Sequence, residues 1–92
     1  MTHILIVEDE PLIAMMLTDW IIELGKQPVG PARSVSEALA LIDKTPIDGA
    51  VLDVNLGHER CDAVAERLME RRIPFVLTTG ESGDDARPRH CR

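Results

Sequence analysis

Three acidic residues and one hydroxyl residue each stand directly after a short apolar run. Glu8 and Asp9 follow one run, Asp53 follows a second, and Thr79 follows a third. Carboxylate oxygens are the ligands that a hard divalent cation such as Mg²⁺ prefers, and a carboxylate beside such an ion can attack a phosphoryl group to form an aspartyl phosphate. A hydroxyl donor would stabilise charge on the transferring oxygens. Each residue alone is better explained as a helix cap or a turn residue, so their joint position carries the prediction.

The apolar runs have the composition of buried strands. Continuous aliphatic and β-branched runs are typical of parallel strands covered on both faces. The expected strands are His3–Val7, Gln27–Val29, Ala50–Leu52 and Phe75–Thr78. Pro28 cannot donate to a strand ladder, so the second strand should lie at a sheet edge. Ligands of open α/β sheets bind beyond the carboxyl ends of the strands, which is where the acidic residues stand.

Segments with helical periodicity separate these strands. The first begins at Pro11, ends near Gly25 and has its inner apolar positions at Ile13, Met16, Leu17, Trp20, Ile21 and Leu24. The second begins with the capping-box pair Ser34 and Glu37 and has its inner positions at Val35, Ala38, Leu39 and Ile42. The third has Cys61, Val64, Ala65 and Leu68 on its inner face. This alternation predicts the α/β class, with a doubly wound parallel sheet and helices on both faces.

The first helix also carries a second apolar stripe, formed by Leu12, Met15 and Ile22. A helix with two apolar stripes must pack against more than the sheet. We therefore expect this helix to meet a further partner.

Composition excludes several functional classes. A chain of 92 residues is enough for one domain, and its net charge of −6 disfavours binding to nucleic acid. No run is long enough for a secretory signal core or a membrane span. The two cysteines do not make a disulfide framework, so we expect reduced thiols and a cytoplasmic location. The segment His58–Cys61 has too few and too closely spaced ligands for a metal site, and no glycine-rich phosphate loop is present.

Three segments together resemble the response-regulator receiver family: Ile4–Pro11, Asp48–Leu56 and Ile73–Gly80. The resemblance covers about residues 3–81 and implies a flavodoxin-like (CheY-like) sheet of order 2-1-3-4. It implies that Asp53 accepts a phosphoryl group from a histidine kinase or histidine phosphotransfer protein. It also implies that Asp9 binds Mg²⁺ directly, Glu8 mainly through water, and Asn55 through its backbone carbonyl. Thr79 would hold a phosphoryl oxygen and act as the switch residue.

The sequence departs from the family at its C-terminal end. The family has a fifth strand ending in a lysine and a fifth helix, whereas the lysines here are Lys26 and Lys44, and Arg87-Pro88 follows Thr79 too closely to replace that strand. We therefore expect residues 1–81 to form an incomplete receiver and residues 82–92 an irregular tail. Truncation, a frame change and a natural short form all remain open.

Three functions are compatible with these patterns. The first is a phosphoacceptor signalling domain, not an enzyme, that acts through a downstream effector protein. The second is a degenerate receiver that serves as an interaction module without phosphorylation, which the missing lysine favours. A phosphatase with an aspartate nucleophile is disfavoured because Glu8-Asp9-Glu10 lacks the Asp-x-Asp pattern of that class. We also expect the chain to form a homo-oligomer through its exposed fourth strand and first helix.

Overall fold

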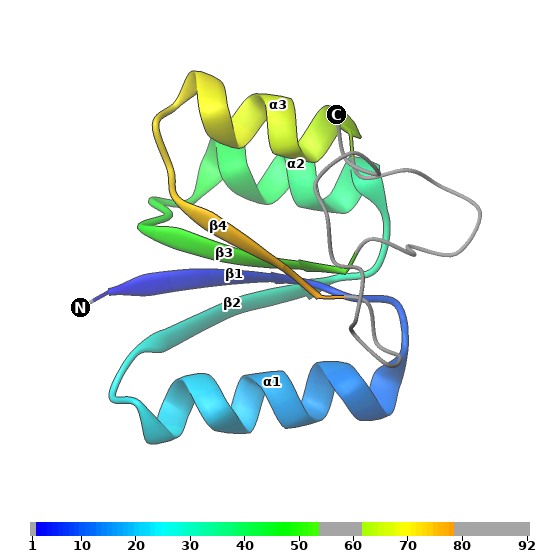
Figure 1. Ribbon diagram of the computed structural model, residues 1–92, viewed down its shortest axis with the longest axis vertical. Helices are drawn as coiled ribbons and strands as arrows, with labels where there is room; N and C mark the ends of the chain where they lie inside the picture. The colour runs from blue at the N-terminus through cyan, green and yellow to red at the C-terminus, as the bar shows by residue number, and fades with distance from the viewer. Residues whose placement is uncertain (1, 54–61, 79–92) are drawn as a thin grey trace.

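A computed structural model describes residues 2–53 and 62–78 of the chain. The elements are β1 (His3–Val7), α1 (Pro11–Glu23), β2 (Gln27–Ala32), α2 (Val35–Lys44), β3 (Gly49–Asp53), α3 (Asp62–Glu70) and β4 (Phe75–Thr78). The strands form one parallel sheet of order β2-β1-β3-β4. Helix α1 covers one face of the sheet, and α2 and α3 cover the other (Figure 1). The predicted α/β class and the strand order 2-1-3-4 are confirmed. Asn55, Cys61, Thr79 and the expected tail of residues 82–92 lie outside the described residues.

The two central strands form the core. All five residues of β3 are buried, and Leu5, Ile6 and Val7 of β1 are completely inaccessible to solvent. Helices α2 and α3 pack Ala38, Ile42, Val64 and Leu68 onto this core, as their periodicity predicts. Burial on both faces explains why β1 and β3 are apolar without alternation.

Strand β2 lies at the sheet edge, as Pro28 predicts, but it runs on to Ala32 instead of ending at Val29. Its register against β1 shifts between Leu5 and Val7. Gly30 lies at this irregularity with φ of +97°, and a Cβ atom there would come within 2.7 Å of the Ala32 backbone nitrogen. Only glycine adopts this backbone without strain. The irregularity brings Ala32 beside the end of β1.

The inner face of α1 differs from the predicted one. Ala14 and Ile21 are buried and Ile13 and Leu17 half-buried, but the other three predicted inner residues, Met16, Trp20 and Leu24, are at least half exposed. The second stripe, Leu12, Met15 and Ile22, is exposed as expected. The helix is apolar nearly all round, so its periodicity does not identify the buried stripe. The small Ala14 identifies it instead, because it allows the helix to approach the sheet.

The start of α2 and its contact with α3 are held by polar pairs. The Ser34 Oγ accepts a hydrogen bond from the Glu37 backbone N–H at 3.2 Å, as the capping box predicts. The Glu37 carboxylate accepts from the Arg33 N–H, one residue earlier than in the usual box. Asp43 of α2 accepts hydrogen bonds from Arg67 and Arg71 at 2.7 Å each. The hydrogen bond from Arg67, with the charges of both arginines, lowers the pKa of the Asp43 carboxyl.

Candidate functional site

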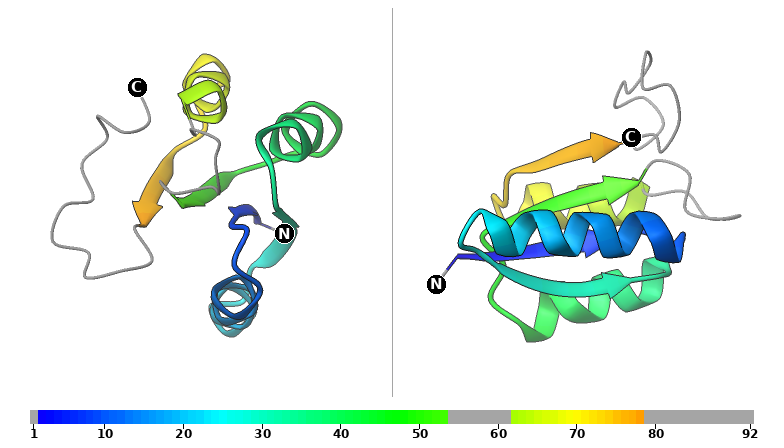
Figure 2. Two further views of the ribbon diagram at one scale, coloured as in Figure 1. Left: turned by 90° about the vertical axis from the view of Figure 1, so that its right-hand side faces the viewer. Right: turned by 90° about the horizontal axis from the view of Figure 1, so that it is seen from below.

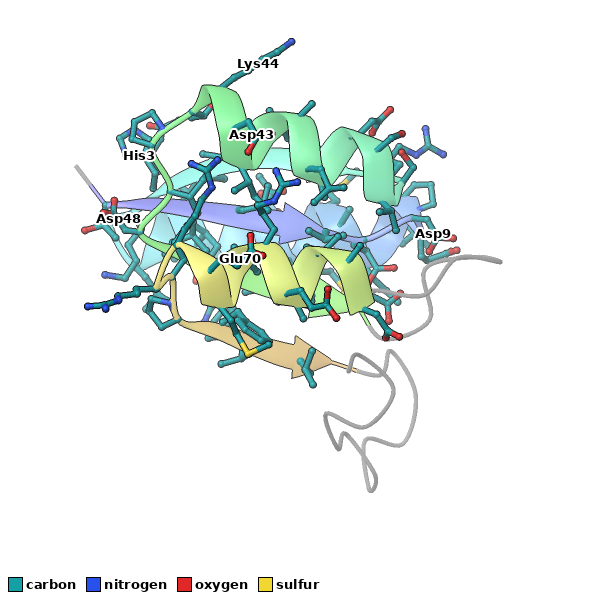
Figure 3. All side chains as sticks on the ribbon, turned by 90° about the horizontal axis from the view of Figure 1, so that it is seen from above. His3, Asp9, Asp43, Lys44, Asp48 and Glu70 are labelled. Carbon is teal, nitrogen blue, oxygen red and sulfur yellow. The ribbon has the colours of Figure 1, made fainter. Side chains whose placement is uncertain are left out.

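Three carboxylates meet where β1 and β3 end side by side. Val7 pairs with Leu52 in the sheet register, so the next residues along each strand, Glu8 and Asp53, are brought together. One carboxylate oxygen from each of Glu8, Asp9 and Asp53 lies within 4.8 Å of the others. Figure 3 shows Asp9 at this end of the molecule and His3 and Asp48 at the opposite end. The predicted convergence of the acidic residues is therefore present.

Glu8 is the most deeply buried member of the cluster, with 1% of its surface exposed. Its backbone N–H donates to the Ala32 carbonyl at 2.9 Å, so the irregular end of β2 fixes its position. Its Oε2 accepts from the Glu10 backbone N–H at 3.0 Å. Its Oε1 is buried and has no hydrogen-bond donor among the described residues. That oxygen therefore needs a proton or a cation.

Electrostatics agree with this geometry. Burial raises the pKa of the Glu8 carboxyl from 4.5 to about 7, against the opposing effect of the Glu10 N–H. A hydrogen bond shared with Asp53 and the charges of Asp53 and Asp9 raise it further. Since two carboxylates cannot share a buried site as anions without compensation, Glu8 holds a proton near neutral pH when no cation is present.

Asp53 is 5% exposed and ends a strand that is buried throughout. Its register partner on β4 is Thr78, the residue immediately before Thr79. Asn55 and Thr79 lie outside the described residues, so the backbone-carbonyl ligand and the phosphoryl-oxygen contact remain predictions. Asp9 is half-buried and is the most exposed of the three carboxylates.

The cluster fits a hard divalent cation. Its donors are all carboxylate oxygens, which Mg²⁺ prefers over nitrogen and sulfur. Three carboxylates supply more negative charge than one such ion would neutralise, and the buried Glu8 Oε1 needs a compensating charge. The residues present therefore match the magnesium site that was predicted, through Glu8, Asp9 and Asp53.

The two lysines lie away from this cluster. Lys44 ends α2 and Lys26 immediately precedes β2, which places both at the amino ends of the strands. Neither lysine can compensate charge at Asp53.

Sequence reasoning did not find two backbone groups that position the site. The Glu10 N–H and the Ala32 carbonyl both hold Glu8. Backbone groups have no residue-type signature, but Gly30 between two prolines in an edge strand was a readable sign of irregular backbone near Ala32.

A groove of about 320 Å³ opens beside the acidic cluster, between α1 and the end of β2. It is lined by Glu8, Pro11, Ala14, Met15, Thr18, Pro31 and Arg33. Most of its surface is apolar, although Glu8 of the acidic cluster is one of its lining residues. It therefore offers a contact surface directly next to Glu8 of the acidic cluster.

The sequence family model of the response regulator receiver domain matches residues 4–91. The chain belongs to the response regulator receiver family. Within the described residues, none of the receiver's helices is both long and apolar enough to cross a membrane.

Relatives of this receiver include regulators and solved receiver structures. It is 38% identical over 81 residues to the phyllosphere-induced regulator PhyR of Methylorubrum extorquens, covering 85% of this chain and 30% of PhyR. The solution structure of SdrG from Sphingomonas melonis Fr1 is 54% identical with a TM-score of 0.84, over 97% of this chain and 76% of SdrG. The crystal structure of TrrA from Thermotoga maritima, in complex with Mg²⁺-BeF, is 27% identical with a TM-score of 0.78. That match covers 89% of this chain and 72% of TrrA. The receiver thus spans less than a third of PhyR's length.

Proposed function

We propose that this receiver accepts a phosphoryl group on Asp53 in a two-component phosphorelay, acting as a phosphoacceptor and not as an enzyme with a separate substrate. The supporting observation is the meeting of three carboxylates at the ends of β1 and β3, with Glu8 and Asp53 almost fully buried. A histidine kinase or histidine phosphotransfer protein would be the donor. A downstream effector protein would receive the signal.

In the proposed transfer, an Asp53 carboxylate oxygen attacks phosphorus, and the bond from phosphorus to the donor's imidazole nitrogen breaks. The leaving imidazole keeps the bonding electron pair. Glu8, Asp9 and Asp53 would hold Mg²⁺, with Asn55 adding a backbone carbonyl, and the bound ion would supply positive charge to the phosphoryl oxygens. Thr79 would donate its hydroxyl to one of these oxygens. The Glu10 N–H and the Ala32 carbonyl keep Glu8 in place throughout.

The groove beside Glu8 supports a protein as the phosphodonor. An apolar surface that begins at the acidic cluster allows a partner to bury side chains while its histidine approaches Asp53. Met15→Lys would place a charge in this groove without altering the carboxylates. It should slow transfer from a phosphorylated partner at least tenfold and leave labelling by acetyl phosphate unchanged. An equal loss of rate with the phosphorylated partner and with acetyl phosphate would mean that the substitution disturbs the acidic cluster and not partner docking.

The test of the phosphoacceptor role is Mg²⁺-dependent labelling with acetyl phosphate, read by intact-protein mass spectrometry. Asp53→Asn should abolish labelling. Asp48→Asn is the matched control, because Asp48 is exposed and lies at the opposite end of the sheet. Labelling of the Asp53→Asn variant at the wild-type level would refute the assignment.

A second candidate, an interaction module that works without phosphorylation, is favoured by the position of the lysines. Lys26 precedes β2 and Lys44 ends α2, so both lie at the amino ends of the strands and neither can pair with a phosphoryl group on Asp53. Loss of such a charge-assisted contact costs about 1.5–3 kcal/mol, which is roughly 10- to 150-fold in rate. Appending a strand that ends in Lys-Pro should therefore accelerate labelling by that factor. An unchanged rate would show that the lysine does not limit this chain.

A further inference from the structure

The edge strand β2 meets β1 in an irregular register just before the acidic cluster. Between the pairs Leu5–Val29 and Val7–Ala32, β1 has one residue and β2 has two, the first of which is Gly30. One residue opposite two is the pattern of a β-bulge. Figure 2 (left) looks onto the carboxyl ends of the strands, where β2 lies at the sheet edge beside β1. The bulge therefore determines which residue of β2 lies beside the end of β1.

The residue placed there is Ala32, and its carbonyl holds the first residue of the acidic cluster. This carbonyl accepts a hydrogen bond from the Glu8 backbone N–H at 2.9 Å. Ala32 is completely buried in the core beneath α2 and α3, so its carbonyl has a fixed position. The Glu8 side chain is held at one oxygen by the Glu10 N–H. The main-chain position of Glu8 therefore decides where its unpartnered Oε1 and the following Asp9 lie.

The bulge depends on the absence of a side chain at Gly30. This residue has a φ of +97°, and a Cβ atom on it would lie 2.7 Å from the Ala32 nitrogen and 3.0 Å from the Ile6 carbonyl oxygen. Real Cβ atoms essentially never come closer than 3.0 Å to such atoms. One of the two contacts is on β2 and the other is on β1, so a side chain would push the strands apart. The separation would occur immediately before the hydrogen bond between Glu8 and Ala32.

On the basis of the magnesium site proposed above, we propose that Gly30 is a positioning residue for that site. Its missing side chain keeps the Ala32 carbonyl on the Glu8 N–H, and this bond holds Glu8 and Asp9 where one cation can bind both. Gly30 is not itself a ligand and acts through Ala32. Disturbing a group that orients metal ligands typically weakens metal binding by about 10- to 100-fold. We expect a loss of this size in Mg²⁺ affinity from Gly30→Ala.

Gly25 provides a matched control for the strain that alanine brings. Its φ is also positive, at +79°, but a Cβ atom on it would have no other atom within 4 Å. It lies between the end of α1 and the start of β2, at the amino ends of the strands and away from the acidic cluster. Alanine is strained by a positive φ at either position, so both variants should lower the stability of the fold. Only Gly30→Ala also displaces backbone next to Glu8.

Titration of the ¹⁵N-labelled, EDTA-treated chain with MgCl₂, followed by two-dimensional NMR, tests the proposal. Gly30→Ala should raise the Mg²⁺ dissociation constant at least about tenfold, whereas Gly25→Ala should leave it within about twofold of wild type. Hydrogen exchange of the Glu8 amide without Mg²⁺ is the second readout. It should be faster in Gly30→Ala relative to the other amides of β1, because this donor loses its acceptor. A purely structural effect would accelerate exchange alike along the strand.

The outcomes separate this role of Gly30 from the proposed function. Equal Mg²⁺ affinity in Gly30→Ala and wild type would overturn the role of Gly30 and leave the magnesium site standing. Equal weakening by Gly30→Ala and Gly25→Ala would also overturn it, since the loss would then follow stability. A wild-type chain without Mg²⁺-dependent shifts would overturn the magnesium site and the role of Gly30 together. Where Gly30→Ala does not fold, Gly30→Asn and Gly25→Asn replace the pair, because asparagine adopts positive φ more readily and still carries a Cβ atom.

Discussion

Glu8 should make the metal-free receiver less stable as the pH rises. Burial raises the pKa of this carboxyl from 4.5 to about 7 in the folded chain. Between these values the folded state holds a proton that the unfolded state has lost, so stability falls with increasing pH. The sign is opposite to that of a salt-bridged carboxylate such as Asp43, whose lowered pKa adds stability that is lost only in acid.

The size of the effect follows from the two pKa values. With 4.5 in the unfolded and about 7 in the folded state, the free energy of unfolding should fall by about 2–3 kcal/mol between about pH 5 and about pH 8. Glu8→Gln removes the titration and keeps a similar shape. The variant should therefore show little of this slope and should be more stable than wild type at the upper pH.

Urea unfolding followed by far-ultraviolet circular dichroism in EDTA is the assay. Saturating Mg²⁺ should raise the free energy of unfolding of the wild-type chain. The increase should be larger at the upper pH, because proton and cation compete for the same oxygens. Glu8→Gln should respond less to Mg²⁺. Parallel pH profiles for wild type and Glu8→Gln in EDTA would refute the reasoning, since they would place the titration elsewhere.

Three further substitutions test the acidic cluster and the packing and helix cap that hold the surrounding fold. Asp9→Ala should remove most of the Mg²⁺-dependent rise in thermal midpoint, because the cation loses an anionic ligand; an unchanged rise would mean that Asp9 is not a ligand. Leu68→Ala should lower the free energy of unfolding by about 2–5 kcal/mol, because this side chain is completely buried against the sheet. Ser34→Ala should cost about 1 kcal/mol by removing the helix cap. Urea midpoints measure both losses, and a Leu68→Ala loss no larger than that of Ser34→Ala would contradict the packing described here.

Prediction from the sequence succeeded where burial alone determines the residue types. Strands β1 and β3 are buried on both faces, so they must be apolar throughout, and their ends are marked by the first acids, Glu8 and Asp53. Because parallel strands end at one edge, the meeting of these carboxylates could be predicted without coordinates. Periodicity likewise identified the inner faces of α2 and α3, whose outer faces are polar.

Prediction failed where sequence signals were ambiguous or non-local. Helix α1 offers apolar residues on nearly every side, so its period could not show that Ala14 is buried while Trp20 and Leu24 are about half exposed. The second strand was expected to end at Val29, whereas it continues through an irregularity to Ala32. The hydrogen bond from Glu8 to the Ala32 carbonyl joins residues far apart in the chain, and no local pattern encodes it.

The prolines of β2 give the sheet unequal edges. Pro28 and Pro31 leave two residues of the edge strand β2 without a backbone N–H donor, and the register of β2 against β1 shifts near Gly30. Within the described part of the chain, the margin formed by β4 carries no proline. Amyloid-like elongation requires strand pairing at both margins of a sheet, and the prolines of β2 make its margin a poor template for a further strand.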